Sequence, residues 1–164
     1  MGLFSKKEKV TVDDMAMRMM LAASKAIGKL TAFEEVDDAR SMMVGMGYFY
    51  GFLKIHLNSI TGLDLATAVI NKSINNLENA TKDNPTFADY GKTVRTIAES
   101  AVENMKYTTK NFPNDPFMAM SVFYMSDMYG TNTVNVDRVD DSKRNLQLLY
   151  GITSNLTKDI KIVK

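Results

Sequence analysis

Apolar positions along most of this chain recur every three or four residues, which is the spacing of one face of an α-helix. Residues 42–53, which read MMVGMGYFYGFL, differ because they carry no charge and no side chain more polar than tyrosine. The run is too short for a membrane span, which needs about 20 apolar residues. A helix that is apolar on all sides must be surrounded by other protein. Residues 42–53 are therefore predicted to form the buried centre of the fold.

Cap boxes of the type Thr-x-x-acid predict where the first three helices begin. They start at Thr11, Thr31 and Thr61, each followed three residues later by Asp14, Glu34 or Asp64. The first helix is expected to end at about Lys29, and the second to cover residues 32–59. The third helix should end in the polar stretch that begins at Lys82.

A capping residue followed by proline marks the start of two further helices. Asn84-Pro85 opens the fourth, whose apolar stripe is the most regular in the chain: Phe87, Tyr90, Val94, Ile97, Ala101 and Met105. Asp115-Pro116 opens the fifth, over residues 116–129, and Gly130 should end it. The fifth helix has no charge before Asp127 and is expected to be largely buried. A sixth helix should begin between residues 137 and 141.

Six helices without a convincing sheet predict an all-α fold, a single-domain bundle over residues 11–164. The second helix (about 32–59) and the fifth (about 116–129) are expected to be central and mostly buried. Residues 1–10 are expected to be a flexible N-terminal tail. Two short alternating segments, 133–136 and 160–163, could be strands. They could pair with each other, or the second could add to the sheet edge of a partner.

Three glycines interrupt the central helix, each at a cost of about 1 kcal/mol relative to alanine. Gly47 and Gly51 are four residues apart and so form one bare strip on the helix surface. The strip could receive a second helix of the same chain in a tight crossing. It could also be a homodimer contact or one wall of a cavity for an apolar ligand.

Methionine is frequent, with 13 residues in a chain of 164. Its flexible side chain suits either an irregular core or a binding surface that must adapt. Glycines, aromatics and methionines come together on the two central helices, where we expect a helix contact or an apolar pocket. The candidate binding residues are Gly47, Gly51, Tyr48, Tyr50, Met43 and Met125.

Charge and cysteine content exclude several classes of function. The 20 Lys and Arg residues balance 19 Asp and Glu residues, and no segment forms the basic face that nucleic acid requires. With no cysteine, the chain has no disulfide and no thiolate metal site. Because apolar residues precede the first lysines, the start does not resemble a secretory signal. We therefore expect a cytoplasmic protein without a transmembrane segment.

No motif for catalysis or for a cofactor is visible. His56 is the only histidine, and a di-iron Glu-x-x-His motif would need glutamate where Leu53 stands. His56 is expected to be a helix-end residue favoured by the helix dipole. The acidic residues 34–38 are interpreted in the same way, as charges that complement a helix N-terminus. We predict no metal and no cofactor.

These exclusions favour a small soluble, non-enzymatic protein that acts by binding another protein, as an adaptor, inhibitor or immunity-type partner. A homodimer is a further possibility for the partner. The alternative is a helical bundle that holds an apolar small molecule between the second and fifth helices. An enzyme that uses His56 with a nearby carboxylate is the remaining and least favoured hypothesis.

Overall fold

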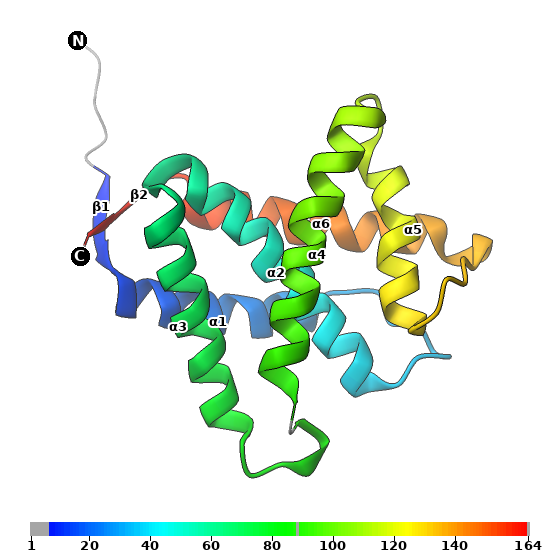
Figure 1. The fold of residues 1–164 in the computed structure, drawn as a ribbon, viewed down its shortest axis with the longest axis horizontal. Coiled ribbons are helices and arrows are strands. Elements are labelled where there is room, and N and C mark those ends of the chain that lie inside the picture. The colour runs from blue at the N-terminus through cyan, green and yellow to red at the C-terminus, as the bar shows by residue number, and fades with distance from the viewer. Residues whose placement is uncertain (1–6, 88, 164) are drawn as a thin grey trace.

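The computed structural model describes residues 7–87 and 89–163, and these form a single all-α domain (Figure 1). The helices are α1 Val12–Ile27, α2 Asp38–Thr61, α3 Leu63–Thr81, α4 Tyr90–Asn111, α5 Pro116–Tyr129 and α6 Val139–Thr157. Two short 3-10 helices, Pro85–Phe87 and Val136–Arg138, precede α4 and α6, and strands β1 Glu8–Thr11 and β2 Ile160–Val163 lie at the two ends. The predicted bundle of six helices is confirmed.

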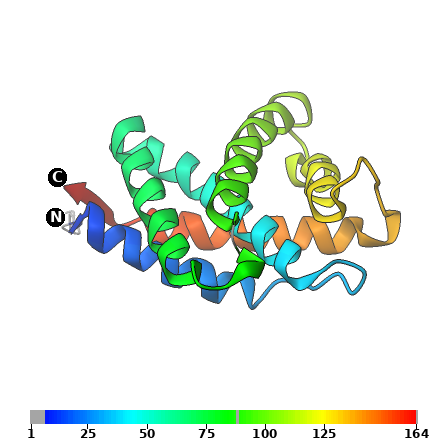
Figure 2. The ribbon, with the colours of Figure 1, turned by 60° about the horizontal axis from the view of Figure 1, so that its bottom comes forward.

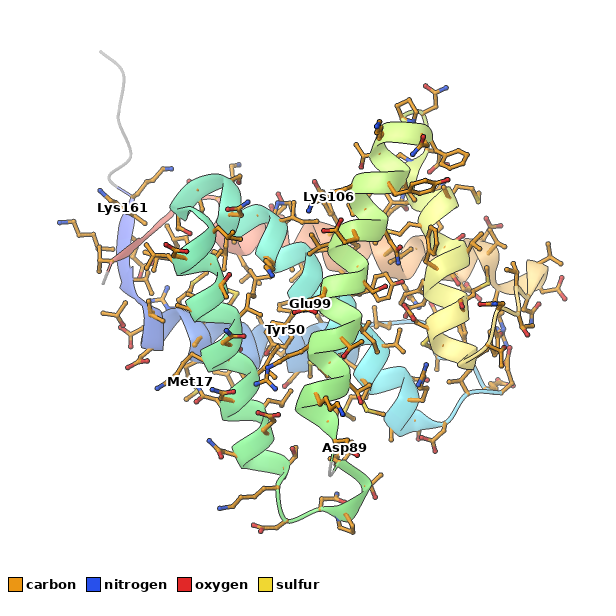
Figure 3. All side chains as sticks on the ribbon, viewed as in Figure 1. Met17, Tyr50, Asp89, Glu99, Lys106 and Lys161 are labelled. Carbon is orange, nitrogen blue, oxygen red and sulfur yellow. The ribbon has the colours of Figure 1, made fainter. Side chains whose placement is uncertain are left out.

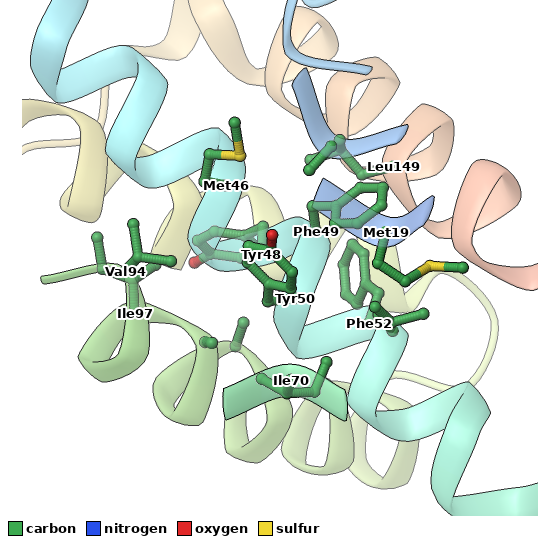
Figure 4. Close-up of a cluster of buried hydrophobic side chains, with 14 of the residues drawn as sticks. Met19, Met46, Tyr48, Phe49, Tyr50, Phe52, Ile70, Val94, Ile97 and Leu149 are labelled. Atoms are coloured by element: carbon green, nitrogen blue, oxygen red, sulfur yellow. The ribbon is translucent and has the colours of Figure 1, made fainter. Parts of the chain in front are cut away.

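Helix α2 lies at the centre of the bundle, with α4 along one side and α6 along the other (Figures 1 and 2). Every residue from 44 to 53 is buried, as the uncharged sequence of this stretch predicts. Figure 4 shows the aromatic residues of α2 between Ile97 of α4 and Leu149 of α6. The rings of Tyr48, Phe49 and Phe52 are completely shielded from solvent.

Helix α5 packs against α6 and α4 and reaches α2 through its buried face. Tyr124 on that face meets Tyr48 edge to face, with 5.0 Å between the ring centroids. The opposite face of α5 leaves Met118 and Val122 exposed. Although it carries no charge before Asp127, α5 is therefore buried on one side only.

Local capping signals place several helix ends where the sequence predicts them. The Thr11 hydroxyl accepts a hydrogen bond from the backbone N–H of Asp14 at 3.1 Å, and this caps α1. The Asp115 carboxylate accepts one from the N–H of Met118 at 3.1 Å, just before Pro116. Gly130 ends α5 with a φ of 67°, in the left-handed region that glycine adopts without strain.

The start of α2 differs from the prediction. The helix begins at Asp38, not near residue 32, and its cap is the Asp37 carboxylate, which accepts from the N–H groups of Ala39 and Arg40. The backbone N–H and C=O of Thr31 are bound instead by the side chain of Asn145 on α6. Because Asn145 binds the backbone groups of Thr31, the residues between Thr31 and Asp37 do not join α2.

Two other helix starts also differ. Thr61 is the last residue of α2, and its hydroxyl donates to the carbonyl of Leu57 and does not cap α3. Gly62, with a φ of 84°, separates the two helices. After Asn84, the Pro85–Phe87 segment forms one 3-10 turn, and α4 begins only at Tyr90.

Of the two segments that the sequence left open as possible strands, residues 160–163 form β2, whereas 133–136 are irregular up to the 3-10 helix Val136–Arg138. The partner of β2 is β1, in a parallel pair that places Val10 opposite Ile162. Both of these side chains are buried, so the pair is part of the core. Residues 8–10, assigned to the tail from sequence, therefore lie in a strand, while residues 1–6 lie outside the described residues.

The strand pair brings the two ends of the described chain to the same end of the molecule (Figure 1). Among the helices that the structure describes, none combines the length and the apolar character needed to cross a membrane.

Candidate functional site

The glycine strip of α2 is filled by α4 of the same chain. A Cβ atom on Gly47 would lie 2.5 Å from the Cβ of Ile97. A Cβ atom on Gly51 would lie 2.8 Å from both the backbone oxygen of Ala98 and the Cβ of Ala101. Both separations are far below van der Waals contact, so the two helices approach as closely as they do only because these side chains are absent. The strip is a tight helix crossing within the chain, with Ile97, Ala98 and Ala101 of α4 in the space that side chains would occupy.

The two predicted tyrosines are buried and each has one polar partner. The Tyr50 hydroxyl lies 2.7 Å from the Ser73 hydroxyl, between α2 and α3, and burial raises the pKa of Tyr50 to about 12 (Figure 3). The Tyr48 hydroxyl donates to Oδ2 of Asp127 on α5 at 2.9 Å. Burial also raises the pKa of Tyr48. Both phenols therefore act as neutral hydrogen-bonding groups inside the protein.

Met125 is buried in the core, and Met43 is half-buried on α2. Two hollows open where the start of α2 approaches α5. One, of about 280 Å³, is lined by Ile27, Leu30, Thr31, Ala32, Asp38, Ser41, Met42, Tyr124 and Met128. The other, of about 360 Å³, is lined by Arg40, Asp89, Lys92, Thr93, Thr96, Ile97 and Asp127. None of the six predicted binding residues is among these lining residues.

Asp127 and Arg40 are polar residues that the sequence analysis did not connect. The Nε and Nη2 atoms of Arg40 donate to the backbone carbonyl of Asp127, in the last turn of α5. A cation at this end of a helix is favoured by the helix dipole. Burial raises the pKa of the Asp127 carboxyl, although the hydrogen bond from Tyr48 and the charge of Arg40 act in the opposite direction.

A groove larger than these two hollows lies elsewhere, between the C-terminal half of α4 and the outer face of α5. This groove has a volume of about 840 Å³. Its lining residues are Tyr107, Asn111, Phe112, Pro113, Asn114, Asp115, Met118, Ala119, Ser121, Val122, Phe123 and Val139. We call it the α4–α5 groove.

Four large apolar side chains of the groove are open to solvent. The exposed fractions are 53% for Tyr107, 49% for Phe112, 38% for Met118 and 43% for Val122. The Tyr107 ring lies edge-on to the rings of Phe112 and Phe123, with centroid distances of 6.3 Å and 6.2 Å. These contacts hold the aromatic wall of the groove in one arrangement.

The turn at the end of the groove is pinned to the rest of the bundle. The Lys143 ammonium of α6 lies 2.5 Å from the Asp115 carboxylate, which also caps α5. This ion pair and the hydrogen bond to Met118 lower the pKa of Asp115. The ion pair therefore links the turn between α4 and α5, at one end of the groove, to α6.

Sequence reasoning missed this groove because it interpreted the uncharged stretch of α5 as buried. The signal that could have located it is the spacing of Met118 and Val122, four residues apart on one helical face. That face is distinct from the one that carries Met120, Tyr124 and Met128. The spacing thus reveals two apolar faces on α5, but the sequence does not show which of the two the core covers.

His56 is half-buried, and its ring lies 4.5 Å from the ring of Tyr150. Its Nε2 atom is buried and finds no hydrogen-bond partner among the described residues. Burial lowers the pKa of His56, which keeps the ring neutral at pH 7. Within residues 7–87 and 89–163, no three acidic or histidine side chains converge in a way that could hold a metal ion.

The acidic stretch before α2 does more than complement a helix dipole. Glu35 accepts hydrogen bonds from Tyr129 at 2.7 Å and from Arg138 at 3.0 Å. These two contacts lower the pKa of Glu35 to about 2. Glu35 thus ties the segment before α2 to the end of α5 and to the start of α6.

The structure is a single-domain all-α bundle whose surface carries the α4–α5 groove and, near the start of α2, two smaller hollows. Comparisons with protein-family models, with curated proteins and with solved structures found no match for this chain.

Proposed function

We propose that this is a non-enzymatic protein that binds another protein through the α4–α5 groove. The observation that carries the proposal is the group of four exposed apolar side chains around this groove: Tyr107, Phe112, Met118 and Val122. Contiguous apolar surface of this kind is typical of interaction sites. Tyrosine, phenylalanine and methionine are also enriched at the centres of protein interfaces. We further propose that the protein acts in the cytoplasm, as its sequence suggests.

The occupant that fits best is the apolar face of an amphipathic helix. Two helices form the walls of the groove, and a third helix can pack between them by inserting side chains three and four residues apart. The volume of about 840 Å³ accommodates several such side chains.

Site-specific photocrosslinking in the native cells tests this proposal. A photoreactive phenylalanine analogue at Val122 should form a covalent product with one dominant protein. The same analogue at Leu21 of α1, which is exposed to 53%, is the matched control and should not form that product. Phe112→Asp should abolish the product, because a carboxylate there would lose its water when the helix docks.

Binding of the cross-linked partner segment, measured with a synthetic peptide, is the second test. A synthetic peptide of the cross-linked segment should bind the wild-type protein as a helix and should bind Phe112→Asp at least about tenfold more weakly. Identical products from positions 122 and 21, or no product at all, would contradict the proposal. A product made of two copies of this chain would replace the partner helix with a homodimer.

A second candidate is a small apolar ligand, which the hollow of about 280 Å³ at the start of α2 favours. Its lining includes Ile27, Leu30, Met42 and Met128, and the Tyr124 ring. The volume lies at the lower limit for ligand sites, which are typically about 300–1,000 Å³. Native mass spectrometry tests this candidate, since a bound ligand would add a constant mass to the protein.

A further inference from the structure

Four charged residues of both signs surround the hollow of about 360 Å³ between the starts of α2 and α4 and the end of α5. They are Arg40, Asp89, Lys92 and Asp127. Asp89 lies at the lower end of α4 in Figure 3. Among the described residues, none of the four forms an ion pair, with each other or with another side chain. Opposite charges therefore line one space without a direct ion pair, although the charge of Arg40 acts on the Asp127 carboxyl.

Asp127 supplies the anionic side of this space. Its Oδ2 atom accepts the hydrogen bond of the buried Tyr48 hydroxyl, which fixes the orientation of the carboxylate. Its Oδ1 atom makes no hydrogen bond with the described residues and is not sealed from solvent. Burial of this carboxylate costs free energy, which the nearby charge of Arg40 offsets only in part, and partly buried carboxylates of this kind are common at functional sites. Oδ1 is available to accept hydrogen bonds from an ammonium group.

Arg40 supplies the cationic side. Its Nε and Nη2 atoms are used by the backbone carbonyl of Asp127, which orients the guanidinium group. The Nη1 atom makes no hydrogen bond with the described residues and is not sealed from solvent either. Its N–H groups can bind a carboxylate. Two exposed residues add one further charge of each sign to the lining of the hollow: Lys92 is positive and Asp89 is negative.

The geometry points to a binding site for a small zwitterion, such as a free amino acid, in this hollow. The ammonium group of the ligand binds Oδ1 of Asp127, and its carboxylate binds Nη1 of Arg40. Thr93 and Thr96 line the same hollow, and Ile97 contributes an apolar surface for the carbon atoms. A volume of about 360 Å³ is large enough for a ligand of this size. The site lies outside the α4–α5 groove, so it does not depend on the proposed function.

Titration with a matched set of probes tests the proposal. Glycine and 4-aminobutyrate carry both charges at two separations, while butyrate and butylamine each carry one. Dissociation constants are measured from the NMR shifts of the backbone amides of Thr93, Thr96 and Asp127. At least one zwitterion should bind about tenfold more tightly than either single-charge probe, because only it uses both sides of the hollow.

Two variants and one control locate the bound probe. Asp127→Asn keeps an acceptor for Tyr48 and should weaken zwitterion binding about ten- to a hundredfold. Thr93→Leu fills the hollow without changing any charge and should weaken binding by a similar factor. Asp137→Asn removes an exposed acid outside the hollow and should leave the affinity unchanged.

Three results would overturn the assignment. The first is that neither zwitterion shifts the three amides. The second is that butylamine or butyrate binds as tightly as the better zwitterion, which would leave one side of the hollow without a role. The third is that Thr93→Leu binds the zwitterion as the wild type does, which would place the probe outside the hollow.

Discussion

The side-chain amide of Asn145 binds the backbone of Thr31 as a strand neighbour would, although the two residues are 114 positions apart. Its Oδ1 atom accepts from the Thr31 N–H at 2.8 Å, and its Nδ2 atom donates to the Thr31 carbonyl at 3.0 Å. Asn145 is only 2% exposed whereas Thr31 is half-buried, so the two hydrogen bonds are partly shielded from water. The connection between α1 and α2 is thereby fixed to α6.

Removal of the Asn145 side-chain amide should lower the stability of the protein. Asn145→Ala would leave the partly buried N–H and C=O of Thr31 without their protein partners, at about 1–2 kcal/mol for each group. We therefore expect the free energy of unfolding to fall by about 2–4 kcal/mol in urea denaturation. Asn155→Ala, at an exposed position of the same helix, is the control and should change it by less than about 0.5 kcal/mol. Equal effects of the two substitutions would show that the Thr31 contact adds no stability.

The glycine strip offers a second test of packing. Gly47→Ala and Gly51→Ala should each destabilise the protein by about 1–3 kcal/mol, because the added methyl group would overlap α4. Gly151→Ala in α6 is the matched control, since nothing lies within 4 Å of its added Cβ. It should raise stability by about 0.4–1 kcal/mol. A higher melting temperature for Gly47→Ala would contradict the close crossing of α2 and α4.

The buried ring of His56 predicts how stability depends on pH. Because burial lowers its pKa in the folded state, the unfolded chain binds a proton more readily there. Stability from this group is complete above the unfolded pKa of about 6.5 and is lost as pH falls below it. His56→Gln should therefore lose less stability between pH 7 and pH 5 than the wild type does, as measured by urea denaturation. Parallel curves for the two proteins would mean that the ring is protonated equally in both states.

The contribution of Asp127 to stability should depend on pH in the direction opposite to that of His56. Burial raises its pKa, so its contribution is most favourable at low pH and is lost as pH rises through the folded-state pKa. Asp127→Asn retains an oxygen that can accept from Tyr48 and removes the buried charge. Thermal unfolding at pH 7 should show the variant to be at least as stable as the wild type, with the difference shrinking toward pH 4. A variant that is less stable at pH 7 would show that the charge interacts favourably with Arg40.

Signals carried by a few adjacent residues could be interpreted from the sequence alone. Thr11, Asp115 with Pro116, and Gly130 act on backbone groups within three residues, so their effect does not depend on the rest of the fold. The burial of residues 44–53 follows equally directly, because a helix without a polar face has no stable position at the surface.

Contacts between distant segments determined the start of α2, the strand pairing and the exposed face of α5. Thr31 has a complete cap box, but Asn145 satisfies its backbone, and α2 starts at Asp38. β2 pairs with β1 because folding brings the two ends of the chain together, which no local pattern encodes. Met118 and Val122 have the same local character as the buried residues of α5, yet they are exposed. Helix spacing and capping are local properties, whereas the exposure of a face depends on which other helices cover it, and only the tertiary structure decides that.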